Sequence, residues 1–255
     1  MTPEEQELHR LESEQTTLED QVSLAELTLE TIKAETAQFQ HHYYQSVGRL
    51  YAELDRLDAE IAMAKAGADP DDIQAQFEAE SAEQRAQQSA EEAGIIDKQP
   101  PPPPEITPEL KQAFRQAAKI MHPDRAISDA ERARRTVIMA QVNVAYAKGD
   151  TAAIEKLITE FGHDPEAITG EDISSRLVKA IRRIAQLRRR LEEAQKEIDT
   201  HKSQELYELM ITVTEAKELG GDPLGDLAKE VIQQISERQI ELEQIRFSNA
   251  EMIEL

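Results

Sequence analysis

His122, Pro123 and Asp124 form a polar tripeptide directly after a stretch of helical periodicity. Proline lacks a backbone N–H and disfavours helical geometry in the residue before it, so the tripeptide is expected to end a helix. A histidine near a helix C-terminus is also favoured by the helix dipole. Because a helix stop explains these residues without any function, a functional role has to come from their surroundings.

The stretch before the tripeptide is amphipathic. Its apolar residues share one face at helical spacing: Leu110, Phe114, Ala117 and Met121. Its cations follow another edge at steps of four: Lys111, Arg115 and Lys119. Such a stripe is as often a solvated face as a contact site, but beside the tripeptide it is suited to steering toward an acidic protein surface.

A second helical stretch follows. A polar turn from Arg125 to Asp129 leads into residues 130–148, and Gly149 ends the pattern. The apolar stripe of this stretch consists of Ile138, Val142 and Ala145. Two helices joined by a His-Pro-Asp loop resemble the core of the J-domain, the module of the DnaJ co-chaperones. The segment LKQAFRQAAKIMHPDR resembles that family's second helix and loop, and NVAYAKGD resembles the end of its third helix.

The resemblance implies a partner and a role for the matching residues. J-domain proteins dock the His-Pro-Asp loop and the basic second helix on the ATP-bound form of a DnaK-type chaperone and trigger its ATP hydrolysis. By match to that motif, His122, Pro123 and Asp124 would form the trigger. The electrostatic contacts implied in the same way are Lys111, Arg115, Lys119 and Arg125.

The sequence also departs from the family pattern. Five prolines, Pro100 to Pro104, stand where the family has a short first helix, so that helix is missing or replaced. The turn after the tripeptide is a few residues longer, and Met121 stands where an aromatic or basic residue is usual. The apolar face of Phe114 and Ile138 therefore needs another cover, which we expect from the terminal helices or from residues 152–161.

The composition favours an all-α protein without chemistry of its own. The chain has no cysteine or tryptophan, and only nine of its 255 residues are glycine, which argues against a disulfide scaffold or a β-rich fold. It has no long apolar run and begins with an acidic segment, so we expect a cytoplasmic protein without membrane contact. No nucleophile, phosphate loop or metal-ligand spacing accompanies the tripeptide, so we expect no enzyme activity, cofactor or metal.

The net charge of −22 is unevenly distributed. The acidic excess lies mainly in residues 1–105, whereas residues 106–170 carry as many bases as acids. This balance argues against nucleic-acid binding, which needs a net cationic surface. One local cluster is the exception: Arg182, Arg183, Arg188, Arg189 and Arg190. We expect this cluster to pair with the acidic N-terminal helix, with a nucleic-acid contact as the alternative.

The first 64 residues have the heptad pattern of one long helix. Apolar residues recur at steps of three and four from Leu11 to Tyr43, and two successive steps of four that end at Val47 shift the phase before the pattern continues to Ile61. A helix of about 60 residues is expected. His41 and His42 point in different directions on a helix, so they predict no metal site.

The C-terminal third carries a second seam. It runs from Ile173 to Ala216 with one phase shift, Gly220 to Pro223 break it, and residues 224–245 are expected to fold back as a helical hairpin. Between the two arms, residues 65–70 end the first helix and a glutamine-rich helix follows. The proline run then acts as a stiff spacer or, as the alternative, as a ligand for an aromatic-grooved domain.

We therefore expect an all-α chain of four parts. These are a coiled-coil helix in residues 1–64, a polar helix and Pro-rich linker in 65–105, a J-domain-like module in 106–165 and a C-terminal antiparallel hairpin in 166–255. The arms would pair within one chain or between chains as a homodimer, and would select location, oligomer or client protein.

Two functions from different classes follow. One is a co-chaperone of a DnaK-type chaperone, and the other is a coiled-coil scaffold that keeps a J-like hairpin for packing alone. The co-chaperone requires His122 and Lys111 to be exposed. The scaffold expects both side chains to be buried against the arms.

Overall fold

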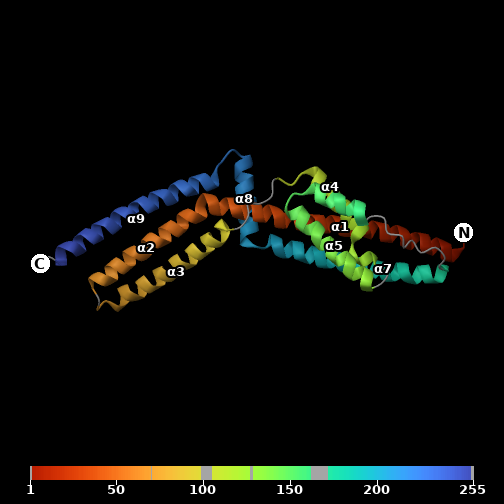
Figure 1. The fold of residues 1–255 in the computed structure, drawn as a ribbon, viewed down its shortest axis with the longest axis horizontal. Helices are drawn as coiled ribbons and strands as arrows, with labels where there is room; N and C mark the ends of the chain where they lie inside the picture. Colours follow the sequence, from red (N-terminus) through yellow and green to blue (C-terminus); the bar gives the residue numbers. More distant parts are fainter. Residues whose placement is uncertain (1, 70, 99–104, 127–128, 162–171, 254–255) are drawn as a thin grey trace. The chain divides into compact units, whose positions relative to one another are not determined.

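The computed structural model describes residues 2–69, 71–98, 105–126, 129–161 and 172–253. All regular elements within these ranges are helical, which confirms the predicted all-α class. No helix among the described residues is long and apolar enough to cross a membrane. The chain folds as two compact units (Figure 1). The first unit comprises Met1–Ala37 and Pro102–Glu208, and the second comprises Gln38–Pro101 and Leu209–Leu255.

Helical backbone runs without a break from Pro3 to Ala68, as the heptad pattern predicts. It consists of α1 (Pro3–Tyr43), a π-helical turn η1 (Tyr44–Gly48) and α2 (Arg49–Ala68). The π turn lies where the apolar pattern shifts its phase, and Val47 within it is fully buried. A wider turn rotates the helix that follows and so realigns the apolar stripe with its packing partners.

In the first unit, α7 (Ile173–Lys202) packs along α1. Two apolar clusters join the helices, one around Leu18 and Leu187 and one around Leu29 and Ala194. Contacts advance in the same direction along both helices, so the pair is parallel. Ion pairs flank the seam: Arg176 with Glu12, Arg183 with Glu19, Arg188 with Glu14, and Arg190 with Glu26. The predicted pairing of the arginine cluster with the acidic N-terminal helix is thus confirmed for Arg183, Arg188 and Arg190.

The same unit contains the predicted helical hairpin. It is formed by α4 (Pro108–Met121), the 3₁₀ turn η2 (Pro123–Arg125) and α5 (Asp129–Ala147). Thr107 caps the first helix because its hydroxyl accepts the backbone N–H of Leu110 at 3.2 Å. Gly149 ends the second helix with φ 69°, a conformation that favours glycine.

The hairpin has a continuous apolar core. The rings of Phe114 and Tyr146 lie 4.8 Å apart and both side chains are buried. The predicted cover comes from two sources, α6 (Thr151–Phe161), which contributes the buried Ile154, and α1, which contributes Leu27. Both the terminal helix and the segment after the hairpin therefore cover the apolar face of Phe114 and Ile138.

In the second unit, α2 packs against α3 (Ile73–Asp97) and α9 (Pro223–Ile253), and these helices lie side by side in Figure 1. The main seam consists of Leu57, Ile61, Val231, Ile235 and Leu242. A smaller cluster joins η1 to α8 (Glu205–Glu218) and to the start of α9 through Val47, Val213 and Leu224.

The two C-terminal apolar seams pack on different stretches of the long N-terminal helix. The apolar seam of α7 packs on α1, and that of α9 packs on α2, rather than the two pairing along their lengths as one C-terminal hairpin. Each C-terminal seam finds a complementary stripe on the N-terminal helix, which periodicity alone does not reveal. The arms pair within the single chain. The Pro100–Pro104 run lies outside the described residues.

Candidate functional site

The tip of the hairpin, His122 to Arg125, is ordered by its own side chains. Helix α4 ends at Met121, and His122 has φ −59° and ψ 135°, the extended geometry expected before proline. Its Nδ1 atom accepts the backbone N–H of Asp124 at 3.2 Å and so caps the following turn. The predicted helix stop is confirmed, and the histidine ring is fixed in one orientation.

Two arginine side chains donate hydrogen bonds to backbone carbonyls in the last turn of α4. Arg135 of α5 donates to the carbonyl of Ile120 at 2.7 Å, and Arg125 donates to the carbonyl of Lys119. The last carbonyls of a helix lack partners within the helix, so Arg135 ties the end of α4 to α5 and Arg125 ties it to the η2 turn.

The other side of the His122 ring faces α1. Its Nε2 atom donates to Oε1 of Glu26 at 2.8 Å, and the Nε of Arg190 from α7 donates to the same oxygen at 3.1 Å. The side chains of His122 and Glu26 are only 12% and 8% exposed. Since Nδ1 accepts a backbone N–H and Nε2 faces a carboxylate, these contacts place a proton on Nε2.

The two donors keep the Glu26 carboxyl ionised despite its burial. Burial alone would raise the pKa of this group, but the hydrogen bond from His122 and the charge of Arg190 outweigh that effect and lower the pKa below its ordinary value. The pKa of Arg190 is raised in turn, because burial would lower it but the neighbouring Glu26 carboxylate outweighs that effect. The three side chains form one buried polar cluster contributed by α1, α4 and α7.

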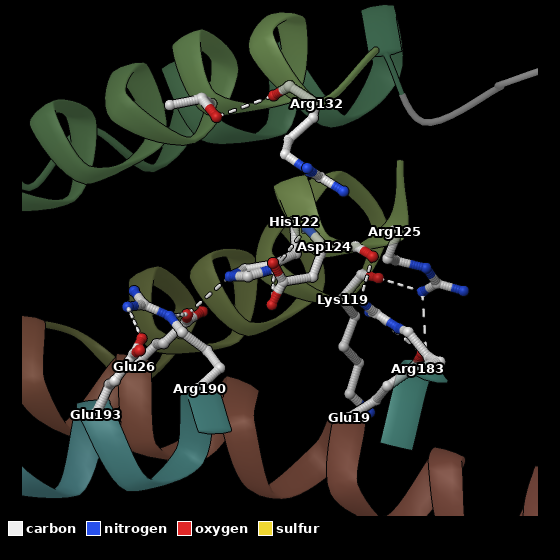
Figure 2. A network of polar contacts seen from close by, with 11 residues as sticks. Glu19, Glu26, Lys119, His122, Asp124, Arg125, Arg132, Arg183, Arg190 and Glu193 are labelled. Atoms are coloured by element: carbon white, nitrogen blue, oxygen red, sulfur yellow. Dashed lines mark hydrogen bonds and ion pairs between the residues drawn. The ribbon is translucent and has the colours of Figure 1, made fainter. Parts of the chain in front are cut away.

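A second layer of charges surrounds this cluster, and Figure 2 shows both layers. Arg183 of α7 lies 3.5 Å from Glu19 and also donates to the backbone carbonyl of Asp124. Burial lowers the pKa of Arg183, and the nearby carboxylates of Glu19 and Asp124 oppose that shift. At the rim, Lys119 pairs with Asp20, and Arg125 lies 4.0 Å from Glu19.

The flank of the hairpin is also attached to α1. The hydroxyls of Thr31 and Tyr146 lie 2.7 Å apart, and Leu27 belongs to the core of the hairpin. Residues on three successive turns of α1 therefore contact the tip, the hairpin core and α5. The J-like hairpin is packed on the N-terminal helix over its whole polar end.

The seven predicted site residues all lie along α4 and the tip, but their environments differ. Lys119 and Arg125 are both 42% exposed yet contact carboxylates of α1. Arg115 is exposed and Lys111 is half-buried, and within the described ranges neither has a recorded ion pair. His122, Pro123 and Asp124 are each partly buried. Glu26 and Arg190 cover the ring of His122 in this conformation, so a role that requires an open His122 needs this contact to separate.

The residues that contact the tip from outside the hairpin were not predicted as site residues. They are Glu19, Asp20, Glu26, Arg183 and Arg190. A faint signal exists in the sequence: Glu19, Ser23 and Glu26 share one helical face beside the apolar seam, and Ser23 and Glu26 are buried. An acidic stripe of this kind usually faces solvent, so periodicity alone does not distinguish it.

The described residues show no grouping of three or more histidine, aspartate or glutamate side chains suited to a metal ion. His41 contacts the side chain of Gln45, 2.7 Å away on the same helix. Comparisons of the chain with known protein families, with curated proteins and with solved structures gave no match.

Proposed function

We propose that this protein is a co-chaperone that docks on the ATP-bound form of a DnaK-type chaperone and stimulates ATP hydrolysis by that partner. The trigger would be His122, Pro123 and Asp124, and the docking cations would be Lys111, Arg115, Lys119 and Arg125. The observation that carries the proposal is the ordered His-Pro-Asp tip between two antiparallel helices, with the histidine ring fixed by the Asp124 amide.

The chemistry of the tip supports this assignment over a purely structural one. A hairpin kept only for packing would be expected to bury apolar side chains at its end, as it does along Phe114 and Tyr146. The tip and the last turn of α4 instead present a histidine and two cations, which pair with carboxylates of α1. Polar contacts of this type can be exchanged for equivalent contacts with a partner, whereas an apolar core cannot.

The arms fit an accessory role in this proposal. Their apolar seams are occupied within each unit, and their outer faces carry the acidic excess of the chain. We assign them to the choice of location, oligomer or client protein, without nucleic acid or membrane as a partner. The protein itself would have no enzyme activity, cofactor or metal.

A coiled-coil scaffold is the second candidate function, and one observation favours it. His122 is only 12% exposed and is covered by the arms, as the scaffold hypothesis expects. In that case Glu26 and Arg190 would be permanent partners of a hairpin that triggers no chaperone.

Single-turnover ATP hydrolysis by a DnaK-type chaperone tests the proposal. The full chain is added in large excess, and His122→Gln is compared with His9→Gln, a matched change at an exposed histidine of α1. We expect wild type and His9→Gln to accelerate hydrolysis, and His122→Gln to lose the acceleration while keeping its helical circular dichroism. Equal acceleration by His122→Gln would leave only the scaffold.

A further inference from the structure

We propose that the acidic face of α1, formed by Glu19, Asp20 and Glu26, occupies in cis the surface at which an acidic partner docks, so that the described conformation is a closed state of the co-chaperone. This inference deepens the proposed function and rests on it. Each of the three carboxylates contacts a residue of the predicted docking site: Glu19 contacts Arg125, Asp20 contacts Lys119, and Glu26 contacts His122.

The spacing of the carboxylates matches this role. Glu19 and Glu26 are seven residues apart and therefore lie on the same face of α1, two turns from each other. Along this face, Glu19 lies beside Arg125 at the rim of the tip and Glu26 lies beside the ring of His122 (Figure 2). Helix α1 thus presents acidic groups to the tip, as an acidic partner would. It covers the ring of His122 as well as the cations at the rim.

The contact is less completely packed than the hairpin core. A cavity of about 270 Å³ lies beside the tip, lined in part by Glu26, His122, Asn143 and Arg190. The buried Oδ1 atom of Asn143 has no hydrogen-bond partner among the residues that the structure describes. The contact therefore leaves space beside polar side chains, which distinguishes it from the closely packed core of the hairpin.

A groove gives an acidic partner access to the closed tip. It has a volume of about 530 Å³ and is bordered by the tip, α1 and the first half of α7. The cations among its described lining residues are Arg125, Arg132, Arg176, Lys179, Arg182 and Arg183. Three carboxylates accompany them, those of Glu12, Glu19 and Asp124, so the groove has a cationic excess in a strongly acidic chain.

Competition between carboxylates would open the contact. An acidic segment entering the groove meets Arg183 and Arg125, which are the cations that Glu19 contacts. Once these partners are exchanged, the Glu26 cluster and the Lys119–Asp20 ion pair still attach the hairpin to α1 at this end. The partner that fits is therefore a protein surface with several carboxylates, and its affinity is reduced by the fraction of chains that are closed.

The test compares full-length wild type with three variants. Glu26→Gln removes the buried charge, Glu19→Gln with Asp20→Asn removes the two rim charges, and Glu7→Gln is a matched control on α1 that loses only an exposed contact with Arg10. The first readout is carbethoxylation of His122 by diethylpyrocarbonate, located by mass spectrometry, which needs no partner. The second is the concentration of chain that half-maximally stimulates a DnaK-type chaperone.

We expect both opening variants to label faster at His122 than wild type and Glu7→Gln, and Glu26→Gln to reach half-maximal stimulation at about tenfold lower concentration. Unchanged labelling, or a wild type that stimulates as efficiently as the opening variants, overturns the closed state but leaves the proposed function in place. Faster labelling with no stimulation by any variant supports the closed contact and overturns the proposed function. Because the rim variant keeps the buried Glu26 carboxylate, it keeps the test decisive if Glu26→Gln fails to fold.

Discussion

The α2–α9 seam of the second unit and the tip contact of the first unit are both helix contacts made by the long N-terminal helix, yet they differ in chemistry. The seam buries Leu57, Ile61 and Val231 and leaves its ion pairs on an exposed rim. The tip contact reverses this arrangement, because its centre is the buried pair of Glu26 and His122. An apolar centre makes a permanent contact, whereas a polar centre loses little when another polar partner replaces it.

Truncation of the apolar seam is expected to have the largest effect. Leu57→Ala removes a side chain that is 3% exposed, and such a change costs about 2–5 kcal/mol of unfolding free energy. Urea denaturation followed by circular dichroism measures the loss. A loss below about 1 kcal/mol would mean that the seam is not the permanent contact described here.

The buried polar contact is expected to contribute less, and in a way that depends on pH. At neutral pH, Glu26→Gln should cost about 1–3 kcal/mol, because it replaces an ionised acceptor of two hydrogen bonds with a neutral one. The folded pKa of Glu26 lies below the ordinary value of 4.5, so its contribution is present above that value and is lost as the pH falls through the folded pKa. His122 and Arg190 face this carboxyl throughout the titration.

Denaturation of wild type and Glu26→Gln between pH 7 and pH 3 checks this prediction. The difference in unfolding free energy should persist down to the ordinary glutamate pKa and shrink below it, because the protonated carboxyl then resembles the amide. A difference that stays constant to pH 3 would contradict the ionised cluster. Glu7→Gln serves as the control for loss of an acidic group from the same helix.

The exposed ion pairs beside the α2–α9 seam are expected to contribute least to the unfolding free energy. Lys65 and Glu241 are 2.8 Å apart, but their side chains are 55% and 32% exposed. Lys65→Ala is therefore expected to change the unfolding free energy by less than about 1 kcal/mol, since solvent and salt screen exposed pairs. A loss as large as that of Glu26→Gln would remove the distinction between the two contacts.

Local features of this fold could be predicted from the sequence because they depend on neighbouring residues. Helical spacing placed Leu110, Phe114 and Met121 in a core, and the phase shift at Val47 marked the π turn. The stop at Pro123 and the turn at Gly149 follow from backbone chemistry. The motif likewise marked His122 and its neighbours as the candidate site.

The environment of the site could not be predicted in the same way. Glu26 is 96 residues from His122 in the chain, and in the sequence it is one of many acidic residues beside a heptad seam. Which of these carboxylates is buried depends on how the hairpin packs on α1, and periodicity describes seams rather than such side contacts. The division into two units was missed for the same reason, since both C-terminal seams could have paired with several apolar stripes.

The most direct measurement of the central claim is the stimulation of single-turnover ATP hydrolysis by the double variant Glu26→Gln/His122→Gln, compared with each single variant. If Glu26 covers a trigger that acts through His122, the gain produced by Glu26→Gln is lost completely in the double variant. If the double variant stimulates the DnaK-type chaperone as strongly as Glu26→Gln alone, His122 is not the trigger and the account is contradicted.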